Sequence, residues 1–293
     1  ALRRMGAEVI EMDTELDWTF PRYNPNPEDR VMLDAMAARG RETGADLAFG
    51  FDGDGDRCGV VDDRGHEIFA DRMGLMLARD LVGDHPGATF VVDVKSTGLY
   101  RTDPVLAAAG ARVVYGMTGH SHMKRAVAAE GALAGFEKSG HVFFAPPLGR
   151  GYDDALVCAR EVLRLIDRSG GRRLSELEAE LPPAFTSLTM NAHCADDTKY
   201  GVVARVTEAY RALAEAGGTI LGRHIRDLVT VNGIRVELED GGWLLVRASS
   251  NKPELVVVVE SLTSEADMRA LFHDEVKPRL AALPEVGGYN QQV

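Results

Sequence analysis

Three aspartates at alternate positions, separated by glycines, follow an apolar run early in the chain. Residues 46–51 predict a buried strand, and Asp52-Gly53-Asp54-Gly55-Asp56-Arg57 comes directly after it. In an extended or tightly turned loop, side chains at i, i+2 and i+4 lie on one side. The glycines let the backbone bend so that the carboxylate oxygens converge. Three converging carboxylates repel one another unless a cation neutralises them, and an all-oxygen set suits Mg²⁺.

Two alternatives compete with a magnesium loop. A solvated acidic turn would explain any single Asp-Gly pair, but it explains the whole hexapeptide at a strand end poorly. An EF-hand needs glycine at its sixth position, where Arg57 lies, and a flanking helix where a strand is predicted. Because Mg²⁺ usually keeps positions open for a substrate phosphate, the loop favours phosphoryl chemistry.

Composition limits the kind of protein and its partners. A chain of 293 residues that is 45% hydrophobic predicts several domains. The net charge of −12 argues against nucleic acid or an anionic membrane as a partner. No apolar run reaches the length of a membrane span, and no signal peptide opens the chain. Cys58, Cys158 and Cys194 are odd in number and widely spaced, which predicts reduced thiols in a cytoplasmic protein.

Strands and helices alternate through the first 170 residues. The predicted strands are 8–12, 46–51, 58–61, 66–69, 89–94, 112–115, 132–136 and 141–144. The predicted helices are 27–43, one from about 71, one ending at Gly110, 121–130 and 152–168. The turn at 62–65 predicts a hairpin between its two flanking strands. The alternation as a whole implies βαβ units and a mainly parallel sheet.

The composition changes after a Leu-Pro-Pro boundary at 181–183. One helix is followed by four apolar strands and a last helix from 264, and the strands are 228–231, 233–238, 243–246 and 255–259. Helices packed on an antiparallel sheet make an α+β module. The predicted fold class is therefore α/β, with mixed α/β domains followed by a C-terminal α+β domain.

Two further polar segments lie at predicted strand junctions. The segment Phe136-Glu137-Lys138-Ser139-Gly140-His141 carries short polar groups that suit hydrogen bonds to sugar hydroxyls, although a polar turn would explain it equally well. Thr118-Gly119-His120-Ser121 opens a helix, with Ser121 as a plausible N-cap. His120 alone is equally typical of a surface residue at a helix start.

Two cationic positions also lie at strand ends. Arg247-Ala248-Ser249-Ser250-Asn251-Lys252-Pro253 interrupts two apolar strands, and an arginine with hydroxyls and backbone N–H groups suits a phosphate. An ordinary hairpin loop is the alternative. Lys95 follows another strand, and open α/β sheets bind ligands at strand ends.

Taken in order, these motifs resemble those of the α-D-phosphohexomutases. The resemblance covers essentially the whole chain and is closest to the bacterial phosphomannomutase/phosphoglucomutase branch. The Asp-Gly-Asp-Gly-Asp-Arg and Glu-Lys-Ser-Gly-His segments are specific, and the other two motifs support them. The resemblance implies the end of family domain 2 in residues 1–70, with the metal loop. It implies domain 3 in 71–188, with the sugar-binding loop, and domain 4 in 189–293, with the phosphate-binding loop.

The resemblance also implies roles for individual side chains. The Mg²⁺ ligands would be Asp52, Asp54 and Asp56. The groups acting on the transferred phosphoryl group and its protons would be Arg57, Lys95 and His120. The groups holding the sugar O3 and O4 hydroxyls would be Glu137 and Ser139, with His141 beside them. The groups holding the other phosphate would be Arg247, Ser249, Ser250 and Asn251.

The chain departs from the family pattern in three places. Phe136 stands where the family usually has glycine, and Ser250-Asn251-Lys252-Pro253 replaces an Asn-Thr-x-Pro ending. The family's catalytic serine, carried as phosphoserine in a Thr-Ala-Ser-His-Asn-Pro-type loop of domain 1, has no counterpart here. We therefore expect an N-terminally truncated form that would act together with the missing N-terminal domains.

The resemblance implies a Mg²⁺-dependent intramolecular phosphotransferase. Such an enzyme interconverts hexose 1-phosphate and hexose 6-phosphate, of mannose, glucose or both, through a phosphoserine and a hexose 1,6-bisphosphate intermediate. Without the phosphoryl donor, this chain alone should bind ligand and turn over little. Two alternatives stay open. The chain could be a non-catalytic sugar-phosphate-binding module, or part of a phosphoglucosamine mutase, a branch that usually has Gln where Lys138 lies.

Overall fold

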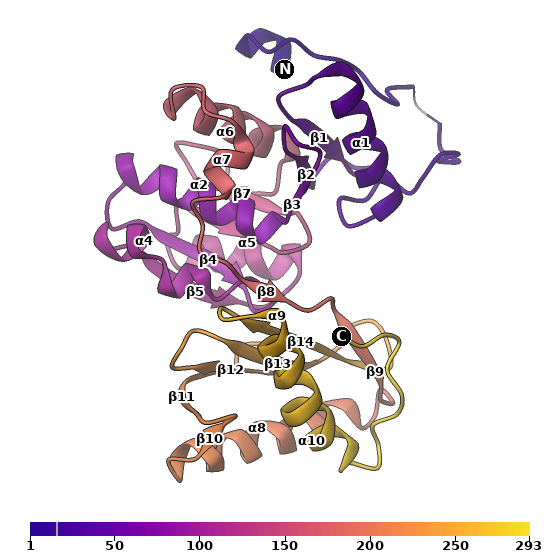
Figure 1. The fold of residues 1–293 in the computed structure, drawn as a ribbon, viewed down its shortest axis with the longest axis vertical. Helices are drawn as coiled ribbons and strands as arrows, with labels where there is room; N and C mark the ends of the chain where they lie inside the picture. Colours follow the sequence, from indigo (N-terminus) through magenta and orange to yellow (C-terminus); the bar gives the residue numbers. More distant parts are fainter. Residues whose placement is uncertain (16) are drawn as a thin grey trace. The chain divides into compact units, whose positions relative to one another are not determined.

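The computed structural model describes residues 1–15 and 17–293, which fold into two compact units (Figure 1). The first unit contains Ala1–Val92, Ala108–Val114 and Gly119–Leu181. The second contains Asp93–Ala107, Tyr115–Thr118 and Pro182–Val293. Two short segments in the middle of the chain, Asp93–Ala107 and Tyr115–Thr118, therefore belong to the second unit, although the residues on either side of each belong to the first.

The first unit begins with a short 3-10 helix, Leu2–Met5, and a helix packed on a three-stranded antiparallel sheet. The helix is α1 (Arg30–Thr43), and the strands, in sheet order, are β1 (Ala48–Phe51), β2 (Cys58–Val61) and β3 (Glu67–Ile68). The Asp29 carboxylate caps α1 by accepting the N–H groups of its first turn, and Gly44, with φ +67°, ends it. The apolar face of α1 packs against the sheet through Met32, Leu33, Met36 and Ala37.

A four-stranded sheet follows, with strand order β5-β4-β6-β7. The strands are β4 (Thr89–Asp93), β5 (Arg112–Gly116), β6 (Ala134–Phe136) and β7 (Val142–Phe144). The helices in this part of the chain are α2 (Ala70–Asp84), α3 (Leu99–Thr102), α4 (Pro104–Ala108), α5 (His120–Ala129), α6 (Ala155–Arg168) and α7 (Leu174–Glu178). Within the first unit, α2 contacts α6, α7 and β6, and α5 contacts β6 and β7.

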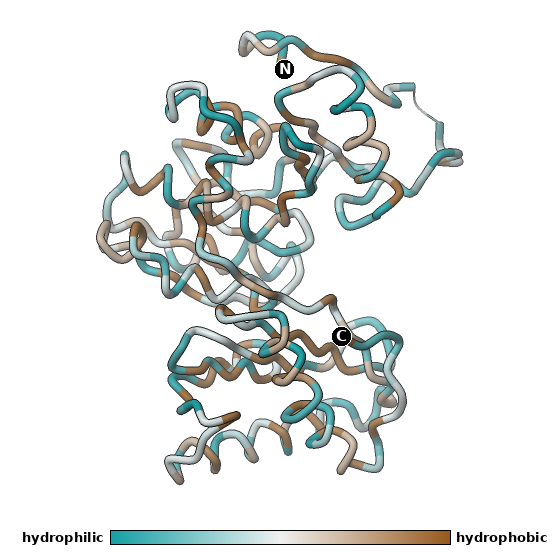
Figure 2. The backbone as a smooth tube through the Cα atoms, viewed as in Figure 1, coloured by the Kyte–Doolittle hydropathy of each residue, from teal (hydrophilic) through white to brown (hydrophobic). Residues whose placement is uncertain are grey.

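The second unit is built on a seven-stranded antiparallel sheet. Its path is β10-β11-β12-β13-β14-β8, and β9 also pairs with β14. The strands are β8 (Phe185–Thr186), β9 (Met190–His193), β10 (Thr219–Ile220), β11 (Arg223–Val229), β12 (Ile234–Leu238), β13 (Trp243–Ala248) and β14 (Glu254–Ser261). The helices are α8 (Lys199–Glu215), α9 (Glu265–Ala270), a π-helical turn Leu271–Val276 and α10 (Lys277–Ala281). Apolar residues run along the central strands (Figure 2), and α8 and α9 cover them.

The predicted fold class is confirmed. Mixed α/β structure precedes an α+β unit with an antiparallel sheet, and the hairpin around 62–65 is present as β2 and β3. The three cysteines are free and buried, as expected. In the described part of the chain, no helix is both long and apolar enough to cross a membrane.

Several predicted details are wrong. Residues 8–12 form no strand, because this half-exposed segment pairs with no other strand in the described chain. Parallel pairing is present in the four-stranded sheet, between β4 and β6, but β7 joins that sheet antiparallel, and the separate β1–β3 sheet is antiparallel throughout, which the alternation did not predict. The loops joining those antiparallel strands are too short for a crossover. Ser121 is not the cap of α5, because the helix already begins at His120, after Gly119.

Candidate active site

The six residues after β1 form the loop of the β1–β2 hairpin. Phe51 and Cys58 are the last paired residues, so the loop contains the whole Asp-Gly-Asp-Gly-Asp-Arg segment. Gly55 has φ +76°, a left-handed conformation that favours glycine. One carboxylate oxygen of Asp52 accepts the backbone N–H groups of Gly55, Asp56 and Arg57, each at 3.1 Å. Asp52 therefore shapes the loop as well as contributing charge to it.

The three aspartates of this loop converge as the sequence predicts. Asp52, Asp54 and Asp56 each offer a carboxylate oxygen, and these oxygens lie within 4.8 Å of one another. An octahedral Mg²⁺ with bonds of about 2.0–2.1 Å places neighbouring oxygens about 2.9 Å apart and opposite ones about 4.2 Å apart. The aspartate side chains therefore fit around Mg²⁺ with little adjustment.

The charge of the loop also favours a cation. Burial raises the pKa of Asp56 to about 7, and the nearby carboxylates of Asp52 and Asp54 add to the shift. Burial would also raise the pKa of Asp52, but hydrogen bonds from Arg57 outweigh it and hold this pKa below its usual value. A divalent cation would relieve the repulsion that Asp56 experiences.

Arg57 contacts the loop and the proline-rich segment before α1. Its Nε lies 2.7 Å from Asp52 Oδ2, and its Nη1 donates to Asn26 Oδ1 at 2.8 Å. The predicted contact with a phosphoryl group stays a prediction. Asn26, which the sequence did not single out, helps to fix this guanidinium.

The predicted metal loop is joined to the predicted sugar-binding loop by backbone contacts. Arg57 and His141 form an antiparallel bridge, and Cys58 N–H donates to the Gly140 carbonyl at 3.2 Å. The imidazole Nδ1 of His141 lies 3.6 Å from Asp56 Oδ1. Two motifs far apart in the sequence thus form one site in the first unit.

Residues 137–141 form the tight turn between β6 and β7. Glu137 is buried, and its Oε1 accepts the Gly119 N–H at 3.2 Å. Gly140 has φ +101° and donates its N–H to the Glu137 carbonyl. The Ser139 hydroxyl is buried and has no hydrogen-bond partner among residues 1–15 and 17–293, so it can bond a ligand. Lys138 pairs with Asp71 at 3.7 Å.

Two histidines and a buried aspartate lie beside this turn. The rings of His120 and His141 are stacked with centroids 5.7 Å apart. Asp153 Oδ2 lies 3.0 Å from Nδ1 of His141 and 3.6 Å from Nδ1 of His120, and Lys124 approaches the other oxygen at 3.4 Å. Burial lowers the pKa of His141; Asp153 opposes this shift, and the cationic neighbours add to it. His141 therefore favours the neutral form, which has a free lone pair.

Sequence reasoning missed Asp153, although a signal was present. Two aspartates, Asp153 and Asp154, precede α6. The Asp154 carboxylate caps the helix by accepting the N–H groups of Leu156 and Val157. One aspartate suffices as a cap, so the second was available for another role.

In the second unit, the segment that carries Lys95 is held by a buried arginine. Arg235 Nη1 donates to the carbonyls of Val94 and Ser96, at 2.9 and 2.7 Å, on either side of Lys95. The guanidinium carbon also lies over two aromatic rings, 3.8 Å from the ring centroid of Trp243 and 4.3 Å from that of Tyr115. Lys95 itself is half-buried at the end of β4, as predicted for a strand-end cation.

A second buried group holds the residues that follow. Glu260 Oε1 accepts the Thr97 hydroxyl at 3.0 Å, the Gly98 N–H at 2.7 Å and the Trp243 Nε1–H at 2.8 Å. Together with Arg235, it fixes the backbone from 94 to 98. The sequence did not predict this role for Arg235 or Glu260, because each lies within a strand of mostly apolar residues.

The predicted phosphate-binding loop is the β13–β14 hairpin loop. Arg247 is half-buried near the end of β13. The Ser249 hydroxyl donates to Asn251 Oδ1 at 3.1 Å, and Ser250 is exposed. Lys199 from α8 donates to the Lys252 carbonyl at 2.9 Å and so helps to hold the loop in place. Sequence reasoning also missed Lys199.

Comparison with known proteins identifies the family of the chain. Three consecutive parts of the chain match the phosphoglucomutase/phosphomannomutase family: residues 1–65 match its alpha/beta/alpha domain II, 69–185 its alpha/beta/alpha domain III, and 190–277 its C-terminal domain. The chain belongs to the phosphoglucomutase/phosphomannomutase family. The family resemblance predicted from the motifs is therefore confirmed.

Proteins similar to this chain have several different names. A phosphomannomutase/phosphoglucomutase of Pseudomonas syringae pv. tomato is 34% identical over 279 residues, which are 94% of this chain and 56% of the relative. A phosphopentomutase of Thermococcus kodakarensis is 34% identical over 268 residues, 90% of this chain and 55% of the relative. The crystal structure of a phosphoglucomutase/phosphomannomutase family protein from Burkholderia thailandensis matches with a TM-score of 0.82 at 31% identity, over 97% of this chain and 57% of that one. The chain thus spans about half the length of these relatives.

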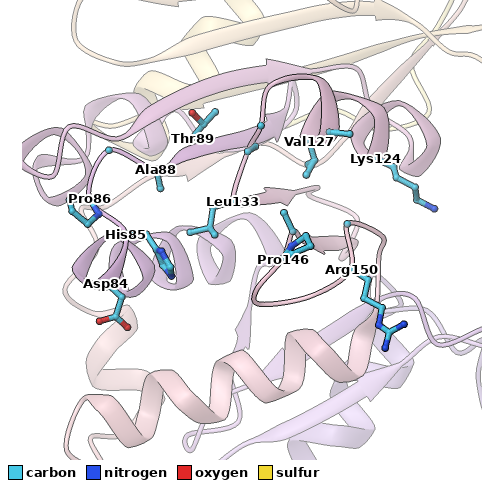
Figure 3. A pocket seen from close by; sticks show the side chains of 16 residues that line it. Asp84, His85, Pro86, Ala88, Thr89, Lys124, Val127, Leu133, Pro146 and Arg150 are labelled. Carbon is cyan, nitrogen blue, oxygen red and sulfur yellow. The ribbon is translucent and has the colours of Figure 1, made fainter.

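A groove in the first unit lies next to the candidate site and shares Lys124 with it. Its volume is about 850 Å³, and it lies between the end of α2, α5 and the loop after β7. Figure 3 shows His85, Lys124, Pro146 and Arg150 along it. None of the predicted site residues lines it, so the groove is not the candidate active site.

Proposed function

We propose that this chain provides the metal-binding and sugar-phosphate-binding parts of a Mg²⁺-dependent phosphohexomutase. The observation that carries the proposal is the backbone pairing of the metal loop with the 137–141 turn, which brings Asp56 within 3.6 Å of His141. A cation site beside hydroxyl-binding groups suits phosphoryl transfer on a sugar. The division into 1–70, 71–188 and 189–293 is part of the proposal and follows from the order of the motifs.

Each group has a proposed role. Asp52, Asp54 and Asp56 would hold Mg²⁺, which would supply positive charge to stabilise the phosphoryl group during transfer. Glu137 and Ser139 bind sugar hydroxyls, and the buried Ser139 hydroxyl supports this because it lacks a protein partner in the described residues. The groups proposed for phosphoryl contact or proton transfer are Arg57, Lys95 and His120. The groups proposed to hold the second phosphate are Arg247, Ser249, Ser250 and Asn251.

The phosphoryl donor in this proposal is a phosphoserine outside the chain. None of the serines here lies in a Thr-Ala-Ser-His-Asn-Pro-type loop. The reaction would pass through a hexose 1,6-bisphosphate, with one phosphate returned to the serine. The chain alone would then act as a sugar-phosphate-binding module. The three buried, free cysteines support a cytoplasmic location.

A mutase assay followed by ³¹P NMR tests the proposal. The chain is incubated with Mg²⁺, a trace of the 1,6-bisphosphate and glucose 1-phosphate, mannose 1-phosphate or ribose 1-phosphate. Alone, it should give no 6-phosphate (or 5-phosphate) above background. Addition of the N-terminal segment that the Pseudomonas syringae relative has beyond the match should give turnover, and a Ser→Ala change in that segment's loop should abolish it. Turnover by the chain alone would overturn the donor assignment.

A further inference from the structure

A second group of metal-ligating side chains overlaps the metal loop. Asp56, His141 and Asp153 each offer a ligand atom, and these atoms lie within 4.8 Å of one another. They come from the metal loop, the turn after β6 and the segment before α6. We propose that these three residues form a zinc-class transition-metal site that is distinct from the three-aspartate site and shares Asp56 with it.

The spacing of the donor atoms fits a tetrahedral ion. Zn²⁺ binds His nitrogen and carboxylate oxygen at about 2.0–2.2 Å, so two ligands of a tetrahedral site lie about 3.3–3.6 Å apart. His141 Nδ1 lies 3.0 Å from Asp153 Oδ2 and 3.6 Å from Asp56 Oδ1. These two separations bracket that range, so small side-chain movements would complete the geometry.

The buried atoms of this cluster point independently to a ligand. His141 Nδ1 and Asp153 Oδ2 are both buried, and neither has a hydrogen-bond partner in the described chain, although they lie 3.0 Å apart. The Asp153 side chain is only 5% exposed. Leaving such atoms unsatisfied destabilises a fold, and a shared metal ion would satisfy both at once. Lys124 approaches the other Asp153 oxygen, which leaves Oδ2 for the metal.

His120 is the candidate for a fourth ligand. Its Nδ1 lies 3.6 Å from Asp153 Oδ2, and its side chain is 55% exposed, so the ring can rotate toward the ion. The complete set would contain two imidazoles and two carboxylates. Imidazole nitrogen favours Zn²⁺ and its neighbours, whereas an all-oxygen set favours Mg²⁺. The two sites therefore differ in the metal they select.

The shared ligand has a consequence beyond the proposed mutase function. A zinc ion bound by Asp56 and His141 removes one ligand from the Mg²⁺ site and occupies the imidazole beside the sugar-binding turn. Zinc binding should therefore weaken Mg²⁺ binding, and excess Mg²⁺ should weaken zinc binding. This competition can be measured on the chain alone, without any catalytic activity.

Calorimetry on the metal-free chain, with ZnCl₂ and MgCl₂ as the probes, tests the proposal. Asp153→Asn should weaken zinc binding by at least the roughly 10- to 100-fold that loss of an outer-shell group costs a metal site, and should leave Mg²⁺ binding unchanged. The matched variant Asp54→Asn should do the reverse, because Asp54 belongs only to the three-aspartate site. With CoCl₂, the wild type and Asp54→Asn should show the intense visible bands of tetrahedral Co²⁺, and Asp153→Asn should not.

Two results would overturn the proposal. One is zinc affinity in Asp153→Asn equal to that of the wild type. The other is a loss of zinc binding in Asp54→Asn as large as in Asp153→Asn, which would place zinc in the three-aspartate loop. If circular dichroism shows that Asp153→Asn does not fold, His141→Ala replaces it, and the same two outcomes apply.

Discussion

Replacement of Arg235 by methionine tests how the Lys95 segment is held. The Arg235 side chain is fully buried, donates to two carbonyls of that segment and pairs with Glu237 at 3.2 Å. Methionine keeps much of the packing volume but leaves the two carbonyls without this donor. Removing one partner of a buried, hydrogen-bonded ion pair typically costs about 3–5 kcal/mol. We therefore expect the free energy of unfolding of the second unit to fall by about 3–5 kcal/mol.

Urea unfolding followed by tryptophan fluorescence measures this loss. The chain has two tryptophans, of which Trp18 is 78% exposed and Trp243 is buried in the second unit. In a Trp18→Phe background, the signal comes from Trp243 alone and reports the second unit. With a urea m-value of about 2 kcal/mol/M, the midpoint should fall by about 1.5–2.5 M.

Arg226→Met is the matched control. Arg226 also pairs with Glu237, at 3.0 Å, but its side chain is 33% exposed, so its loss should cost less than about 1 kcal/mol. If Arg235→Met lowers the midpoint no more than Arg226→Met does, the buried arginine does not hold the 94–98 segment, and the reasoning is wrong.

Three further predictions concern other parts of the chain. Arg247→Ala should weaken glucose 1-phosphate binding by about 10- to 100-fold in calorimetry, because it removes a charge-assisted contact; unchanged affinity would make the loop structural. Asp154→Ala should lower the stability of the first unit by about 0.5–2 kcal/mol in thermal unfolding, since it removes the cap of α6, and no change would refute the capping role. Gly233→Ala should destabilise the second unit by about 1–3 kcal/mol in urea, because Gly233 has φ +80° and an added Cβ would collide with the Val246 carbonyl oxygen; an unchanged midpoint would contradict this.

The convergence of the three aspartates could be predicted from sequence because the contacts that produce it are local. Asp52, Asp54 and Asp56 lie within five residues, and the alternation that brings them together is set by one hairpin loop. Gly55 predicts the turn, and the apolar run before the loop predicts the strand. The same holds for α1, whose cap at Asp29 and end at Gly44 lie beside the helix in sequence.

The remaining site residues depend on contacts that no local pattern records. Asp153 approaches His141 only because the segment before α6 returns to the β6–β7 turn. Arg235 lies in a strand of the second unit and acts on carbonyls about 140 residues earlier. The strand predicted at 8–12 fails for the same reason, since a strand requires a partner that sequence alternation alone cannot supply.

Calorimetric titration of the chain with MgCl₂ tests the central assignment most directly. At pH 8 the Asp56 carboxylate is ionised, because its pKa is about 7. The account predicts one Mg²⁺ per chain, binding weakened at least tenfold by Asp54→Asn, and no effect of Asp34→Asn, which removes an exposed carboxylate on α1. Equal Mg²⁺ affinity in the wild type and in Asp54→Asn would contradict the three-aspartate site.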